Sequence, residues 1–186
     1  MKRMKTLLGL LLCCCAGMLQ AQVETIDLGA RGKITLYLLG EWSVDYSTLG
    51  KTNTVSITPK QEGVNASCTL AFTFPEIDRL ETKARLKSQV ETDCFGLAEG
   101  SAERKAVARE LAVRAGIGFA CNFTDPELIG QPPKKGDYKV TTVGKVKLAP
   151  DVVIDVQILA DGFKDEPYQQ LLGAIEGMEF APGRGR

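Results

Sequence analysis

Residues 65–74 read NASCTLAFTF, and this stretch decides the fold class because its apolar and polar side chains alternate with a period of two. The odd-numbered side chains are polar, apart from one alanine. The even-numbered side chains are apolar and lie on one face: Ala66, Cys68, Leu70, Phe72 and Phe74. This alternation is typical of a β-strand with one buried face. Pro75 then ends the strand, because proline cannot donate to a sheet.

The segment after this strand predicts a helix from Asp78 to about Cys94, because it contains no glycine or proline and is rich in good helix formers. Gly96 fits a helix C-cap. A second helix is predicted over Asp165–Met178. Its apolar residues fall on one side: Leu171, Leu172, Ile175 and Met178.

The rest of the chain reads as short strands. Residues 105–114 fit either a strand or a helix, and the hairpin connection at 114–116 favours the strand. Short connections make antiparallel neighbours, so the predicted class is α+β, an antiparallel sheet flanked by a long middle helix and a C-terminal helix. The other predicted strands are Val23–Leu28, Lys33–Leu38, Trp42–Tyr46, Thr54–Thr58, Gly116–Thr124, Tyr138–Leu148 and Val152–Leu159.

The N-terminus has the pattern of a secretory signal peptide. Residues 1–5 carry three positive charges, residues 6–19 are apolar, and Ala21 supplies a small residue for cleavage. The predicted organisation is a signal peptide at 1–21, one α+β domain at 22–182 and a frayed tail at 183–186. The expected location is periplasmic or secreted. A lipoprotein is disfavoured, because none of the cysteines at 13–15 follows a small residue.

Composition excludes several function classes. The 186 residues contain no histidine, which removes Ser-His-Asp and Cys-His catalysis and His-ligated metals. No apolar run reaches the roughly 18 residues of a membrane span. Removing residues 1–21 takes three of 23 basic residues and none of 23 acidic ones, which leaves a net charge of −3. That balance argues against nucleic-acid binding. We recognise no metal-ligand set, no cofactor motif and no paired catalytic carboxylates.

Polar residues at two strand ends form the candidate ligand site. Strand ends and loops commonly present such groups to ligands. Two other interpretations stay open: a side chain of this group caps the turn at 126–129, or the tyrosine simply packs its ring. The candidate residues are Asn122, Thr124, Asp125, Tyr138 and Thr141.

Three cysteines outside the predicted signal lie on apolar faces: Cys68, Cys94 and Cys121. Counted from the chain reversal at Pro75, Cys68 and Cys94 end at similar heights on a strand and a helix. These two are the favoured pair if a disulfide forms. Free buried thiols are the alternative.

The order of elements, together with the Trp-bearing turn Gly40-Glu41-Trp42-Ser43-Val44, resembles the sandwich of PsbP, the periplasmic protein DcrB and related exported proteins. The segments 118–125, 132–139 and 159–162 are similar to small exported bacterial proteins of unknown function. The resemblance implies a PsbP-like sandwich with an accessory or binding role.

These observations lead to one main hypothesis and two alternatives. The first is a non-enzymatic, exported accessory protein of the bacterial envelope that binds an envelope protein or a small ligand. The second is a structural or assembly factor that acts through a sheet edge or a helix face. A histidine-free enzyme is the least favoured.

Overall fold

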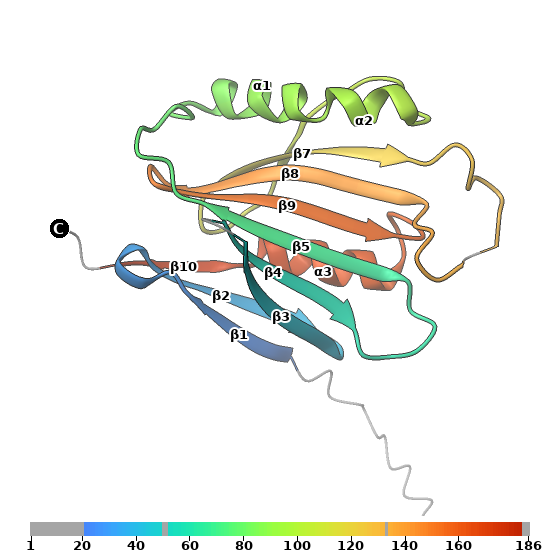
Figure 1. The fold of residues 1–186 in the computed structure, drawn as a ribbon, viewed down its shortest axis with the longest axis horizontal. Helices are drawn as coiled ribbons and strands as arrows, with labels where there is room; N and C mark the ends of the chain where they lie inside the picture. Colours follow the sequence, from blue (N-terminus) through green and yellow to red (C-terminus); the bar gives the residue numbers. More distant parts are fainter. Residues whose placement is uncertain (1–20, 50–51, 133, 184–186) are drawn as a thin grey trace, which may run out of the picture.

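The computed structural model describes residues 21–49, 52–132 and 134–183, which form an α+β fold with two antiparallel sheets (Figure 1). The predicted signal peptide lies outside the described residues, except for Ala21. The strands are β1 (Ala21–Asp27), β2 (Gly32–Leu39), β3 (Trp42–Leu49), β4 (Thr52–Pro59), β5 (Ala66–Thr73), β6 (Arg109–Leu111), β7 (Ile117–Thr124), β8 (Val140–Ala149), β9 (Val152–Ala160) and β10 (Glu179–Pro182). The helices are α1 (Lys83–Asp93), α2 (Phe95–Gly100) and α3 (Glu166–Glu176), with one 3₁₀ turn at Gly29–Arg31.

The strands divide into a three-stranded sheet, β1-β2-β10, and a seven-stranded sheet, β3-β4-β5-β9-β8-β7-β6. The α+β class and the antiparallel pairing are confirmed, but the prediction of a single sheet is wrong. The chain turns a corner after β2, where the indole N–H of Trp42 donates to the carbonyl of Leu39 at 2.7 Å. Strand β2 then pairs with β10, a strand that the sequence did not reveal.

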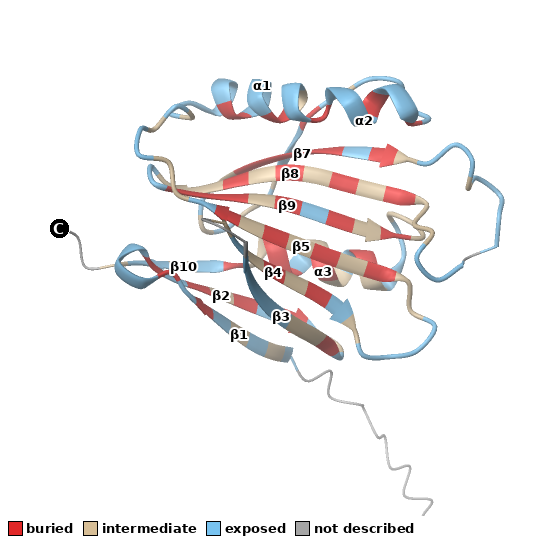
Figure 2. Cartoon of the chain, in the orientation of Figure 1, coloured by how far each residue is buried: buried red, intermediate tan, exposed pale blue. Residues whose placement is uncertain are grey.

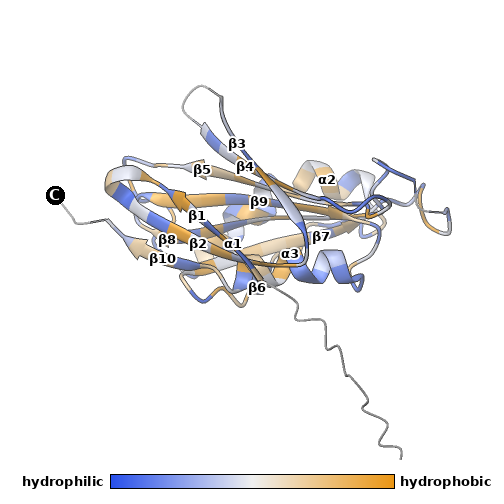
Figure 3. Cartoon of the chain, turned by 90° about the horizontal axis from the view of Figure 1, so that it is seen from below, coloured by the Kyte–Doolittle hydropathy of each residue, from blue (hydrophilic) through white to orange (hydrophobic). Residues whose placement is uncertain are grey.

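A central core fills the space between the two sheets, and α3 packs into it (Figures 2 and 3). The even-numbered residues of β5 face this core, as their alternation predicted. Leu70 and Phe72 are only 0% and 1% exposed. Trp42 is also buried there. The core residues from the other elements include Ile34, Leu36, Leu38, Ile154, Ile158, Leu171, Ile175 and Met178.

A second, smaller core lies on the opposite face of the seven-stranded sheet, where α1 and α2 cover β7 and β8 (Figure 1). Phe119 and Phe123 are buried here, on the other face from Leu70 and Phe72. The helical residues that meet them are Leu86, Val90, Cys94 and Ala98.

The middle helix is shorter than predicted, and it is followed by a second one. Helix α1 begins after Thr82, whose hydroxyl accepts from the Arg85 amide at 3.2 Å. Residues 78–82 form a loop, and Gly96 lies inside α2 instead of capping α1. Within 105–114 only β6 is a strand, paired with β7. At the C-terminal end, the Gly183 amide still donates to the Arg31 carbonyl, while residues 184–186 lie outside the described residues.

Candidate functional site

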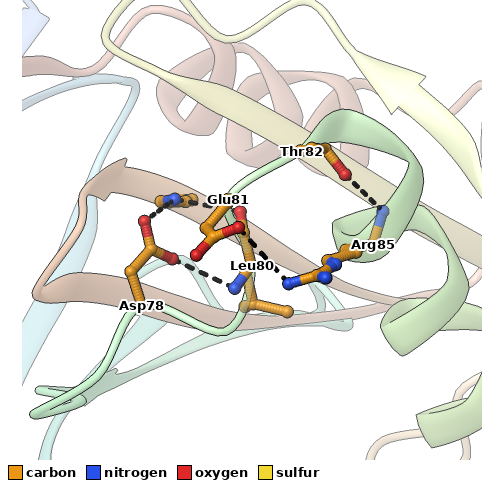
Figure 4. Close-up of polar contacts among 6 residues, drawn as sticks. Asp78, Leu80, Glu81, Thr82 and Arg85 are labelled. Carbon is orange, nitrogen blue, oxygen red and sulfur yellow. Dashed lines mark hydrogen bonds and ion pairs between the residues drawn. The ribbon is translucent and has the colours of Figure 1, made fainter.

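The loop between β5 and α1 is held against the sheet by Asp78 (Figure 4). One oxygen of its carboxylate accepts from the Leu80 amide at 3.0 Å, and the other accepts from Lys147 Nζ at 2.5 Å. The same Nζ donates to the Leu80 carbonyl at 2.9 Å. Two polar contacts therefore join the loop to a strand almost 70 residues away in the chain, and a third lies within the loop.

The ion pair of this loop is largely shielded from solvent, because the side chains of Lys147 and Asp78 are 12% and 23% exposed. The hydrogen bond from Lys147 lowers the pKa of Asp78 below its ordinary value, with help from the Leu80 amide. Paired charges are tolerated at such depth, whereas an unpaired one is costly. The contacts of Lys147 therefore hold the loop in place against the sheet.

The end of the loop leads directly into α1 (Figure 4). Besides the Thr82 cap, the Arg85 guanidinium bonds the Glu81 carboxylate at 3.4 Å, one turn apart. Exposed pairs of this kind contribute little stability. This pair places one negative and one positive charge at the start of α1, on side chains that are exposed to solvent.

A second lysine of β8, Lys145, joins α1 to the sheet. Its ammonium group pairs with Asp155 on β9 and, at 3.0 Å, with Asp93 at the end of α1. Asp93 also accepts from Gln89 at 2.7 Å. Burial lowers the pKa of Lys145, but the two aspartates outweigh it and hold that pKa above its ordinary value. The lysine therefore stays charged and bridges both carboxylates.

These groups border a cleft of about 510 Å³ between the loop, α1 and the sheet. Its floor is formed by strand residues and its rim by the loop. Ile77 stands at that rim with 67% of its surface exposed. The lining residues are Thr73, Pro75, Glu76, Ile77, Asp78, Arg79, Leu80, Gln89, Lys145 and Val153.

Sequence reasoning missed this cleft. A signal was present in β8, where Lys145 and Lys147 alternate with the core residue Val146. Two lysines at alternate positions of a central strand lie on the same face, and such charges need partners. Their partners, Asp78, Asp93 and Asp155, come from three separate segments, and only the tertiary structure brings them together.

The residues predicted from the sequence divide between two places. A second cleft, of about 440 Å³, is lined by Thr124, Asp125, Tyr138 and Thr141 together with α2. Asn122 is not part of it, because its side chain points to the opposite face of β7. There Asn122 accepts a hydrogen bond from Thr142 at 2.8 Å.

Most polar groups of the second cleft already have structural partners. The amide and hydroxyl of Thr124 both donate to Glu103, at 2.9 and 2.8 Å. Burial raises the pKa of Glu103, but these bonds outweigh it and lower that pKa. Asp125 accepts from the Glu127 amide at 2.9 Å. The capping interpretation thus accounts for Asp125, and ligand binding in this cleft stays a prediction.

The three described cysteines are free and buried. Cys68 belongs to the central core and Cys94 to the second core, so the seven-stranded sheet separates the favoured disulfide pair. Cys94 instead lies beside Cys121. Burial raises the pKa of Cys68 and of Cys94 to about 12.

Across the described ranges, no three acidic or cysteine side chains gather as a metal site would require. In the same ranges no helix has both the length and the apolar character of a membrane-crossing segment.

Comparison with known proteins gives one distant likeness. No family model matches the chain, and no curated protein matches it. Among solved structures, the chain is similar to the Ran-binding protein Mog1p of Saccharomyces cerevisiae, with a TM-score of 0.47 and 16% sequence identity. The match covers 86% of this chain and 96% of Mog1p.

The comparisons give no support to the predicted function and location. We expected an exported accessory protein of the bacterial envelope, periplasmic or secreted, and the similar structure is that of a Ran-binding protein. No match connects the chain with an envelope, and we do not retain that assignment. The neighbour's fold is compatible with an α/β sandwich, and the specific likeness to PsbP stays a prediction.

Proposed function

We propose that the chain is a non-enzymatic protein-binding domain, and that the loop at residues 75–81 with its cleft is the recognition surface. The observation that carries this proposal is a large apolar side chain displayed on a loop that is already fixed. Ile77 is 67% exposed, while its neighbour Asp78 is tied to Lys147 at 2.5 Å.

A fixed loop favours binding because little conformational entropy is lost when the complex forms. Residues that dominate binding energy are typically apolar or aromatic anchors surrounded by a polar rim. Ile77 has such a rim in the nearby residues Glu76 and Arg79, which are exposed. The cleft beside it, of about 510 Å³, has room for a side chain of the partner.

The sheet next to the cleft supplies a broad surface for the same partner. On the face opposite the central core, β4 and β5 carry small hydroxyl side chains, such as Ser56 paired with Thr69. The row continues into Gln157 of β9. Helices α1 and α2 pack on β7 and β8 and leave this part of the face open (Figure 1).

The charges at the cleft support recognition and not acid–base chemistry. Asp93 and Asp155 lie close together, but the ammonium group of Lys145 pairs with both. Both carboxylates are therefore engaged in ion pairs with one ammonium group. The PsbP-like arrangement of layers is part of this proposal, and the order of elements supports it.

The test is a quantitative capture experiment with three immobilised proteins. They are the wild type, Ile77→Asp, and the matched control Ile129→Asp, which changes another isoleucine, 59% exposed, in a different loop. We expect a partner that the wild type and the control retain and that Ile77→Asp loses. With the purified partner, Ile77→Asp should weaken binding at least about tenfold, or about 1.4 kcal/mol.

Equal retention by all three proteins would contradict the proposal. Loss of the partner by both variants would also contradict it, because general surface charge would then be the cause.

A further inference from the structure

A third hollow, of about 320 Å³, lies at the edge of the seven-stranded sheet, on the face opposite the Ile77 loop. It is lined by Glu103, Lys105, Val107, Arg109, Asn122 and Phe163. Ala106 and Ala108 pack into the second core. Val107 and Arg109 alternate with them and line this hollow, and Lys105 stands at its rim, where it also borders a hollow on the helix side.

Two cations in this hollow have no acidic partner. Among the described residues, no carboxylate lies within 4.0 Å of Lys105 or Arg109, although nine other lysines and arginines form ion pairs. The one acid of the lining, Glu103, already accepts two hydrogen bonds from Thr124. Arg109 and Lys105 thus place two unpaired positive charges at this hollow against one engaged negative charge, and the hollow favours an anion.

A buried relay orients the third polar group, Asn122. The Thr142 hydroxyl donates to Asn122 Oδ1 at 2.8 Å and lies 2.7 Å from the Tyr168 hydroxyl. Each hydroxyl has a single proton, so Tyr168 must donate to Thr142. This chain occupies the amide oxygen of Asn122 and leaves Nδ2, which has no acceptor among the described residues, free to donate to a ligand.

The walls of the hollow add apolar surface. Val107 is 46% exposed. Phe163 is fixed edge-to-face against Tyr168, with ring centroids 5.4 Å apart. A bare inorganic anion would satisfy the cations and leave this apolar surface without a partner. A volume of about 320 Å³ is at the lower end of the range for small-molecule sites.

We propose that this hollow binds a small organic carboxylate. The guanidinium of Arg109 offers the paired donors that suit a carboxylate. Lys105 and Asn122 Nδ2 supply further donors, and the organic part lies against Val107 and Phe163. The site is independent of the protein-binding surface, because the sheet separates the two.

The test is an NMR titration of the full chain labelled with nitrogen-15. The probes are benzoate, its uncharged analogue benzamide, and inorganic phosphate. We expect benzoate to shift the backbone amides of 105–109 and the side-chain amide of Asn122, and we expect benzamide to leave them unchanged. Phosphate should bind at least about tenfold more weakly than benzoate, because it makes no apolar contacts.

Variants with matched charge complete the test. Arg109→Gln and Lys105→Gln should each weaken benzoate binding about tenfold, and Asn122→Asp should abolish it by adding a negative charge. Lys60→Gln removes the same charge at an exposed position elsewhere and should leave binding unchanged. The spectrum of each variant shows directly whether it is folded.

Three results would overturn the proposal. They are equal shifts with benzamide, phosphate binding as tightly as benzoate, and equal weakening by Lys60→Gln.

Discussion

The two faces of the seven-stranded sheet are built for different purposes. One face is closed by the small sheet and α3, and its side chains are fully buried, as Ile57, Leu70 and Ile154 show. The other face is covered by helices only over β7 and β8, and it carries lysines paired with aspartates beside a row of hydroxyl groups. The closed face supplies most of the stability, and the open face is the one on which we propose recognition.

Strand β8 shows how one strand serves both faces. Val140 and Val146 point into the central core, whereas Lys145 and Lys147 point to the cleft side. Because the side chains of a strand alternate, the two faces can evolve separate roles without changing the backbone. The contrast leads to four predictions, ordered from the largest expected effect on stability to the smallest.

The largest effect is expected in the central core. Phe72→Ala should lower the free energy of unfolding by about 3–5 kcal/mol, because it leaves a cavity among fully buried residues. The measurement is urea unfolding. Thr69→Ala, on the other face of the same strand, is the control and should cost under about 1 kcal/mol. Similar losses for both variants would contradict the division between the faces.

The second core should be less sensitive. Leu86 of α1 is 1% exposed, but it belongs to a smaller cluster near the edge of the sheet. We expect Leu86→Ala to cost about 2–3 kcal/mol, the lower part of the range for a buried leucine. The same unfolding experiment measures it. A loss as large as that of Phe72→Ala would show that both faces support the fold equally.

The loop anchor should make a contribution that depends on pH. The folded-state pKa of Asp78 lies below its unfolded value, because Lys147 donates to the ionised carboxylate. The pair therefore stabilises the fold above the ordinary pKa of about 4, and this contribution is lost as the pH falls through the lowered pKa.

Unfolding of the wild type and Asp78→Asn from pH 6 to pH 2 measures this contribution. The difference in stability should be largest at pH 6 and should vanish at the acidic end. Glu76→Gln, in the same loop but outside any described ion pair, is the control and should show no such convergence. A difference that is constant with pH would mean that the ion pair does not stabilise the loop.

The smallest effect is expected at the displayed side chain. Ile77→Asp should change the free energy of unfolding by no more than about 0.5 kcal/mol, because the side chain is 67% exposed. Urea unfolding checks this, and the result also validates the capture experiment. A loss above about 1 kcal/mol would mean that Ile77 supports the fold and is not simply displayed to a partner.

Part of the candidate site could be predicted from the sequence. Polar residues at the ends of β7 and β8 suggested a shared location, and four of them do line one cleft. Asn122 was assigned to the same group because it is close to Thr124 in the chain, but its side chain is engaged by Thr142 away from the cleft. The cleft beside Ile77 escaped prediction, because the helix-forming residues before α1 gave no indication of a loop anchored by Lys147.

Local residue pattern was sufficient for the α+β class, for the strands with strict alternation, and for the burial of Leu70 and Phe72. These properties depend on the periodicity of apolar side chains, which is a property of the local sequence. The division into two sheets, the start of α1 at Lys83, and the placement of Cys68 and Cys94 on opposite faces came only from tertiary packing. Each depends on a contact between distant segments, such as β2 with β10 or Asp78 with Lys147, and no local pattern records such a contact.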